Sequence, residues 1–132
     1  MYSTAIFFDN WTGAQNDEAE EVLHSVDRLE EIVRLLDQRR HTMLTLEAAN
    51  GAHLSVGGGN GEYVVFATFD GETFFNLTSG GLEDGTRELV AGGQLGEFPS
   101  RTIVDLETAA AAAVTFARDG KLDESLTWER QD

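Results

Sequence analysis

The sequence predicts an α+β fold: a mostly antiparallel β-sheet of about six or seven strands, with two helices packed on one face. Helical patterns occupy two separate stretches, at residues 17–39 and 106–118. Between them lie short segments of alternating apolar and polar residues, separated by turn sequences that are typical of hairpins. Strands that are grouped between two helices favour an α+β arrangement over alternating βαβ units. A length of 132 residues suits one domain, so we expect residues 1–132 to fold together.

The first third of the chain is expected to form a strand, a loop and a long helix. Ser3–Asp9 is predicted to be a short strand and Asn10–Asn16 a loop. A helix is predicted over residues 17–39 because apolar residues recur there every three or four positions. These positions are Val22, Val26, Leu29, Val33 and Leu36. The acids at residues 17–21 and the arginines at 39 and 40 suit the two ends of the helix dipole, so we assign those acids a structural role.

The next segment is predicted to be a hairpin. Thr42–Ala48 and Ala52–Val56 flank a short loop that ends in Gly51, a residue that readily adopts the left-handed conformation such loops need. The resulting register sets Leu46 opposite Leu54 and Leu44 opposite Val56. All four apolar side chains then share one face of the sheet, which we expect the helices to cover.

A second hairpin is predicted around Asp70-Gly71, a two-residue turn sequence. Direct pairing of Glu62–Phe69 with Glu72–Thr78 sets Phe66 opposite Phe75 and Val64 opposite Leu77, all on the core face. The opposite face is then more aromatic and apolar than a solvated face should be. It would carry Tyr63, Val65, Ala67, Phe69, Glu72, Phe74 and Asn76.

The last third is predicted to contain a strand, a helix and a final strand. A glycine-rich acidic loop at Ser79–Thr86 precedes a strand at Arg87–Ala91, and Gly92–Gly96 is expected to be a further loop. Five consecutive alanines favour the helix at Leu106–Arg118. Asp105 is its expected N-cap and Gly120 its expected C-cap, and Leu126–Glu129 is expected to be the closing strand.

The glycines at Gly57–Gly61 invite comparison with a phosphate-binding loop. Such a loop needs a helix N-terminus after the glycines, whereas a strand is predicted to follow here. We therefore interpret Gly57–Gly61 as a connection between two strands.

The charge of the chain constrains its partners. The sequence contains 24 acidic and nine basic residues, giving a formal net charge of −15. Such a charge repels nucleic acid and anionic membranes, so we expect neither as a partner. Solubility alone would explain the charge equally well. The sequence has no cysteine, no signal-peptide pattern and no long apolar run, so we expect a cytoplasmic protein.

The sequence contains no recognisable catalytic or metal-binding set. His24, His41 and His53 are scattered and lack metal-ligand spacing, so we expect no metal and no cofactor. Carboxylate pairs are common, but neighbouring acids on helices and loops are usually solvated. We therefore expect a protein that is not an enzyme. Two alternatives remain open: a small enzyme that uses carboxylates alone, and an adaptor or oligomeric scaffold that self-associates through the open sheet face.

A series of motifs follows in order from Thr42 to Glu129. Leu54–Gly59 (LSVGGG) precedes a strand and a D-G hairpin, and Gly92-Gly93 precedes Phe98-Pro99. An alanine-rich helix then leads through Phe116 to Gly120, and the closing strand ends in LTWE. In this order and spacing the chain resembles the Imm1 family of bacterial immunity proteins.

The resemblance implies a function. Immunity proteins of this family are encoded beside polymorphic toxins, often with deaminase-type toxin domains, and bind the cognate toxin in the cytoplasm to block its active site. Toxins that act on nucleic acid have basic clefts, which an acidic protein can occupy. We therefore expect an inhibitor that binds a basic toxin domain and is itself a monomer or a weak homodimer.

Loop acids and open-face aromatics are the expected toxin-binding residues. Aromatic anchors surrounded by acids suit docking on a basic cleft. The predicted set is Glu62, Tyr63, Phe69, Glu72, Phe74, Glu83, Asp84 and Glu97. The alternative is that these loops are merely solvated and that the segment around Trp11 covers the aromatics.

Overall fold

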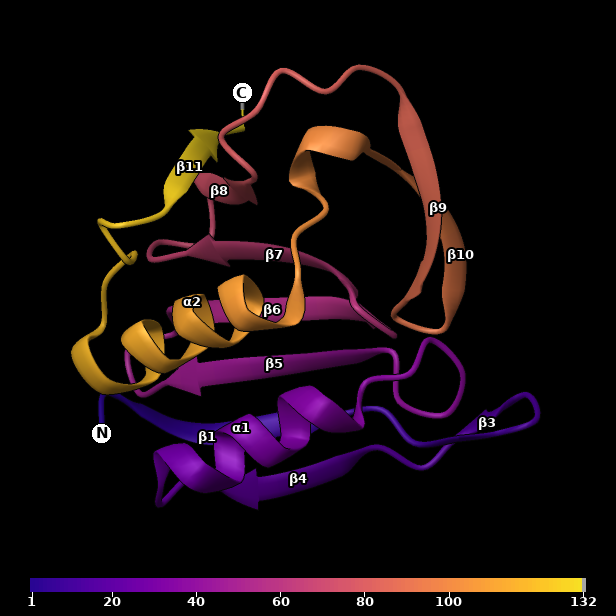
Figure 1. The fold of residues 1–132 in the computed structure, drawn as a ribbon. Helices are drawn as coiled ribbons and strands as arrows, with labels where there is room; N and C mark the ends of the chain where they lie inside the picture. The colour runs from indigo at the N-terminus through magenta and orange to yellow at the C-terminus, as the bar shows by residue number, and fades with distance from the viewer. Residues whose placement is uncertain (132) are drawn as a thin grey trace.

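The computed structural model describes residues 1–131 and confirms the predicted fold class, with both helices on one face of a seven-stranded antiparallel sheet (Figure 1). The strand order is β11-β8-β7-β6-β5-β1-β4. These strands are β1 (Ser3–Phe8), β4 (Ala19–Val22), β5 (Met43–Ala48), β6 (His53–Gly59), β7 (Glu62–Thr68), β8 (Phe74–Thr78) and β11 (Thr127–Arg130). The helices are α1 (Val26–Leu35) and α2 (Leu106–Asp119). Neither of these two helices in residues 1–131 is long and apolar enough to cross a membrane.

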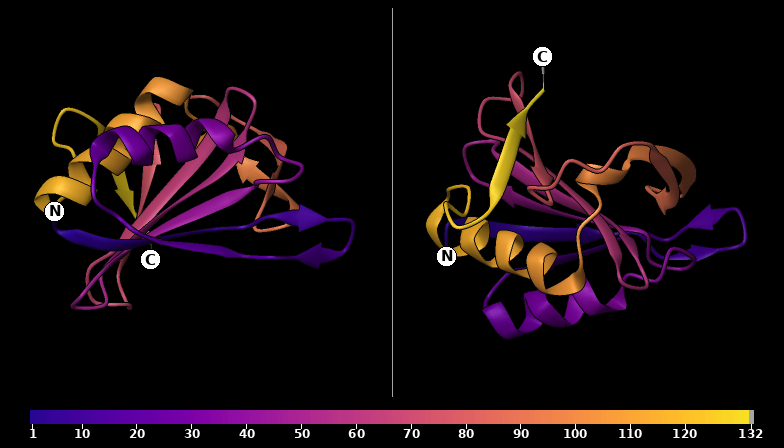
Figure 2. Two further views of the ribbon diagram at one scale, coloured as in Figure 1. Left: turned by 90° about the horizontal axis from the view of Figure 1, so that it is seen from below. Right: turned by 45° about the horizontal axis from the view of Figure 1, so that its top comes forward.

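Two small hairpins complete the fold. One consists of β2 (Trp11–Thr12) and β3 (Gln15–Asn16), and the other of β9 (Thr86–Ala91) and β10 (Gln94–Pro99), which leads into the short 3-10 helix η1 (Ser100–Thr102). The β2–β3 hairpin was predicted entirely as a loop, and the β9–β10 hairpin was predicted as one strand followed by a loop. The β9–β10 hairpin lies on the side of the sheet away from the helices (Figure 2). There Leu89, Val64 and Ile103 form a small second core, against which Phe98 packs.

The main core lies between the sheet and the two helices. Its sheet side includes Leu44, Leu46, Leu54 and Val56, all completely buried. The predicted register of the β5–β6 hairpin is confirmed, because Leu44 pairs with Val56 and Leu46 with Leu54. On the helix side, Phe116 of α2 is completely buried beneath the edge of Tyr2, with the ring centroids 5.6 Å apart.

The predicted register of the β7–β8 hairpin is wrong by one residue. Phe66 pairs with Asn76 and Ala67 with Phe75, so Phe66 lies on the face away from the helices. The turn explains the shift: the Asp70 carboxylate accepts hydrogen bonds from the backbone N–H groups of Glu72 and Thr73, each at 2.8 Å. These bonds stabilise a five-residue loop instead of a two-residue turn. A one-residue slip moves every side chain of a strand to the opposite face.

The predicted first helix is wrong over its first third. Residues 19–22 form β4, which extends the sheet by pairing with β1, and Val22 is 65% exposed instead of buried. The helix starts after Ser25, whose hydroxyl accepts a hydrogen bond from the backbone N–H of Arg28 at 3.2 Å. It ends at Leu35, shortly before Asp37, whose carboxylate accepts hydrogen bonds from three following backbone N–H groups. The acids at 17–21 therefore belong to a hairpin and an edge strand, not to a helix terminus.

The second helix and its caps follow the sequence prediction. The Asp105 carboxylate accepts a hydrogen bond from the backbone N–H of Thr108 at 2.8 Å. Gly120 ends the helix in the left-handed conformation, with φ of 66°. The closing strand is also as expected. The connection predicted at Gly57–Gly61 is shorter than expected, because Gly57–Gly59 belong to β6 and only Asn60-Gly61 forms the turn to β7.

Candidate partner-binding face

The sheet face opposite the helices, here called the open face, carries several half-buried side chains. The pairing registers place on it alternate residues of each strand, including Phe7, Thr45, Glu47, His53, Phe66, Phe74, Asn76 and Glu129. The β9–β10 hairpin bounds this face on one side (Figure 2).

A cleft of about 450 Å³ lies where the open face meets the β9–β10 hairpin. Phe66 and Phe74 come from the sheet, and Phe98 comes from β10. We call this feature the aromatic cleft. Its other lining residues are Val64, Val65, Asn76, Pro99, Arg101, Thr102 and Gln131. Aromatic side chains are enriched in the cores of protein–protein interfaces.

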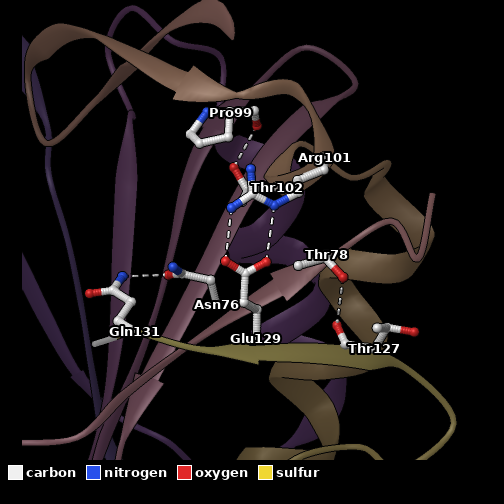
Figure 3. A network of polar contacts seen from close by, with 8 residues as sticks. All are labelled: Asn76, Thr78, Pro99, Arg101, Thr102, Thr127, Glu129 and Gln131. Atoms are coloured by element: carbon white, nitrogen blue, oxygen red, sulfur yellow. Dashed lines mark hydrogen bonds and ion pairs between the residues drawn. The ribbon is translucent and has the colours of Figure 1, made fainter. Parts of the chain in front are cut away.

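An ion pair fixes the rim of the aromatic cleft (Figure 3). Arg101 in η1 donates two hydrogen bonds to Glu129 of β11, at 3.0 Å from Nε and 2.8 Å from the second nitrogen. This bidentate contact lowers the pKa of the Glu129 carboxyl and raises that of Arg101. The amide of Gln131 donates a further bond to Asn76 at 2.8 Å. Two separate side-chain contacts thus link η1 to β11, and β8 to the residue that follows β11.

The aromatic residues predicted to bind the toxin fall in different places. Phe74 lies in the aromatic cleft, where its ring meets the ring of His53 at 6.3 Å in an edge-on arrangement. Tyr63 is only 3% exposed and belongs to the main core, and Phe69 packs against Phe116 on the helix side. Their predicted position on the open face is therefore wrong, because it assumed the two-residue turn at Asp70-Gly71.

The loop that carries the predicted acids Glu83 and Asp84 passes beside η1. Glu83 and Asp84 are exposed in the loop that joins β8 to β9. This loop is tied to the rim at both ends: the backbone N–H of Ser79 donates to the carbonyl of Arg101 at 2.8 Å, and that of Ser100 donates to the carbonyl of Gly85 at 3.0 Å. Ser79 also donates its hydroxyl to Glu83 at 2.7 Å. The two ends of the loop are thus fixed beside η1, the element that carries Arg101.

The other predicted acids have distinct local roles. Glu62 forms an ion pair with Arg87 of β9 at 2.5 Å, so its charge is balanced. Glu97 is exposed on β10 and accepts a hydrogen bond from the hydroxyl of Thr86 at 2.9 Å. Glu72 is exposed in the loop between β7 and β8. Glu62 and Glu97 therefore lie at the β9–β10 hairpin, whereas Glu72 lies at the other end of β7, so the three acids do not converge on one site.

Trp11 does not occupy the aromatic cleft. Its indole N–H donates to Asp9 at 2.8 Å, and its ring lies against Gly93 at the turn of the β9–β10 hairpin. The alternative in which this segment covers Phe74 is therefore wrong. Sequence reasoning missed Phe66, Phe98 and Arg101 as members of the cleft. Phe66 required the correct hairpin register. Phe98 required recognition of β10, whose Gly96 and Pro99 are uncommon in strands.

Hydrogen bonds lower the pKa of further carboxyl groups besides that of Glu129. The backbone N–H groups of Thr73 and Glu72 lower the pKa of Asp70. The pKa is also lowered at Glu21, Asp37, Asp105 and Asp123. A general acid at neutral pH needs the opposite, a raised carboxyl pKa. Within residues 1–131, histidines and acids form no group of three that could hold a metal ion.

A comparison with models of protein families identifies the family of this chain. The model of the family described as "Immunity protein Imm1" matches residues 17–130, and the chain belongs to this family. The family indicates a role in immunity against a toxin. A search of curated proteins gave no match. The matched region includes all residues of the aromatic cleft except Gln131.

Proposed function

We propose that this protein binds a cognate toxin domain through the open face and neutralises it by occluding a basic active-site cleft. The observation that carries the proposal is the aromatic cleft, a concave apolar site on the one sheet face that the helices leave uncovered. In a member of the Imm1 family, an uncovered site of this composition is a natural place for a toxin. The role is one of binding, with no chemical step.

The aromatic rings supply the affinity in this proposal. Phe66, Phe74 and Phe98 are held by a sheet and a hairpin, so little conformational entropy is lost when a partner covers them. The Arg101–Glu129 pair beside them is already formed and offers a polar rim. A few such anchors usually account for most of the binding energy of an interface.

The negative charge of the protein selects for a basic partner. With a net charge of −15 and with Glu83 and Asp84 exposed in the loop beside η1, the surface attracts a basic domain and accelerates its association. A toxin that acts on nucleic acid, such as a deaminase-type domain, has a basic cleft of the required sign. We place the encounter in the cytoplasm, as the family resemblance implies, with one monomer of this protein bound to one toxin.

A co-expression experiment tests the proposal. The toxin domain encoded beside this gene is produced in a sensitive bacterial strain, with and without the protein, and the affinity of the purified pair is measured by calorimetry. We expect rescue of growth by the wild-type chain. Absence of both rescue and binding would refute the proposed function.

Two adjacent phenylalanines provide a matched pair of variants. Phe74 lines the aromatic cleft, whereas Phe75 pairs with Ala67 and so points to the helix side of the sheet. Phe74→Ala is expected to weaken toxin binding about tenfold or more, equivalent to roughly 1.4 kcal/mol, mainly through faster dissociation. Phe75→Ala should leave the affinity within about threefold. Equal losses from the two variants would move the binding site away from the open face.

A further inference from the structure

A second concave site lies between the two helices, on the opposite side of the sheet from the aromatic cleft. The groove has a volume of about 700 Å³, and α1 and α2 lie side by side along it (Figure 1). We call it the helix groove. Its lining comes mainly from α1 and α2, namely Glu30, Arg34, Leu106, Glu107, Ala110, Ala111, Val114 and Thr115, with Gly61, Asp105 and Asp123 at its ends. The proposed toxin-binding function makes no use of it.

The floor of the helix groove is apolar because of the alanine run in α2. Three of the five alanines face the core and are buried, whereas Ala110 and Ala111 line the groove. Leu106, Ala110 and Val114 follow one another at four-residue intervals, which makes an apolar stripe about 12 Å long. The small alanine side chains in the middle of this stripe leave the groove hollow.

The rim of the helix groove is acidic. Glu30, Asp105, Glu107 and Asp123 line it, against one cation, Arg34, which is already paired with Glu30 at 3.9 Å. A hydrogen bond from Thr108 lowers the pKa of Asp105, and one from the Ser125 hydroxyl lowers that of Asp123. Both carboxyl groups are therefore ionised at neutral pH. An occupant of this groove must bring positive charge beside its apolar surface.

The walls of the helix groove determine the conformation of the occupant. Inside α1 and α2 the backbone N–H and C=O groups bond within their own helix, so the groove offers few backbone partners. An extended segment laid on this apolar floor would leave its own backbone groups unpaired, at a cost in free energy. A helix satisfies its backbone internally and presents a continuous row of side chains instead.

We propose that the helix groove binds a cationic amphipathic helix of a protein partner. The apolar face of that helix rests on Leu106, Ala110 and Val114, and its lysine or arginine side chains meet Glu107, Asp105 and Asp123. The bound helix would lie as a third member of the helix layer, filling the groove between α1 and α2.

A synthetic peptide tests this inference without any toxin. The probe is a 15-residue peptide of leucine and lysine with helical amphipathic spacing, and its counterpart contains glutamate in place of lysine. Affinity is measured by fluorescence anisotropy at about 0.15 M salt, where exposed long-range attraction is largely screened. We expect the lysine peptide to bind and to become helical, and the glutamate peptide to bind at least tenfold more weakly. Equal binding of both peptides would refute the charge complementarity.

Variants of the chain locate the bound peptide. Ala111→Trp fills the groove and is expected to weaken the binding of the lysine peptide at least tenfold. The circular dichroism spectrum of the protein should be unchanged. Glu107→Lys and Glu47→Lys change the net charge equally, but Glu107 lines the groove whereas Glu47 lies on the open face. We expect the affinity for the lysine peptide to fall at least fivefold in Glu107→Lys and less than twofold in Glu47→Lys. Equal losses would show general attraction to an acidic protein and would overturn the proposal.

Two measurements on the wild-type protein test which partner occupies the helix groove, and they do not depend on the folding of a variant. In the wild-type protein, the methyl resonances of Ala110, Ala111 and Val114 should shift when the lysine peptide is added, and shifts confined to the open face would overturn the assignment. Sedimentation of the wild-type chain alone should show a monomer. A dimer that Ala111→Trp dissociates would assign the groove to a second copy of the chain instead of a cationic helix.

Discussion

The two faces of the sheet differ in what covers them. On the helix side, Leu46 and Leu54 are completely buried beneath α1 and α2. Phe116 of α2 is also completely buried in this core. On the open face, Phe66 and Phe74 remain half-buried, because the β9–β10 hairpin covers the sheet only as far as Val64. Apolar side chains on the helix side are therefore fully removed from water, whereas Phe66 and Phe74 on the open face are not.

The largest expected effect is on the helix side. Phe116→Ala removes a completely buried ring that contacts Tyr2 and Phe69, and should lower the free energy of unfolding by about 3–5 kcal/mol. Urea denaturation measures the change. Phe66→Ala on the open face is the control, and its cost should be clearly smaller because its ring is half-exposed. A cost as large as that of Phe116→Ala would remove the distinction between the two faces.

The next effect concerns Asp9, which connects the sheet to the two small hairpins. Its buried carboxylate accepts hydrogen bonds from the indole of Trp11 at 2.8 Å and from the backbone N–H and the hydroxyl of Thr42, the former at 2.6 Å. The Thr42 hydroxyl also accepts one from the backbone N–H of Gly93 at 2.8 Å. Asp9→Ala leaves buried donors unpaired and should lower the free energy of unfolding by about 2–3 kcal/mol.

Hydrogen exchange provides a second measurement for Asp9. The Gly93 amide should exchange faster in Asp9→Ala than in the wild-type protein, because its acceptor Thr42 is no longer fixed. Unchanged protection of Gly93 would show that the β9–β10 hairpin is held in place independently of Asp9.

A smaller effect depends on pH and involves the turn after α1. Burial opposes ionisation of Asp37, but hydrogen bonds from the backbone N–H groups of His41, Arg39 and Arg40 lower its pKa below the ordinary value. The folded state therefore binds this proton less readily than the unfolded state. Its contribution to stability is complete above the unfolded pKa of about 4 and is lost as the pH falls through the lower folded value. Asp37→Asn should flatten the fall in urea midpoint below about pH 5, and an unchanged slope would contradict this role.

The smallest effect on stability is expected at the two acids of the loop between β8 and β9. Glu83 and Asp84 are exposed, so the double substitution Glu83→Lys with Asp84→Lys should hardly change the melting temperature. It should slow association with the toxin several-fold and flatten the dependence of the association rate on salt. Stopped-flow measurements at two salt concentrations give both quantities. An unchanged association rate would exclude this loop from the encounter.

The sequence determined the elements in which neighbouring residues specify the structure. The β5–β6 register follows from a short loop around Gly51 and an unbroken alternation of apolar side chains. Helix α2 follows from its alanines together with Asp105 and Gly120 at its ends. The same local motifs carried the resemblance to the Imm1 family that the family comparison confirmed.

Tertiary structure alone decided the elements whose partners are distant in the chain. Residues 19–22 have a helical pattern of apolar positions, but pairing with β1 makes them an edge strand. The side-chain hydrogen bonds of Asp70 shifted the β7–β8 register and placed Phe66 on the open face. The aromatic cleft then formed from β7, β8 and β10, and the helix groove from α1 and α2. Both sites join segments far apart in the chain, and periodicity within one segment does not encode which distant segment it will pack against.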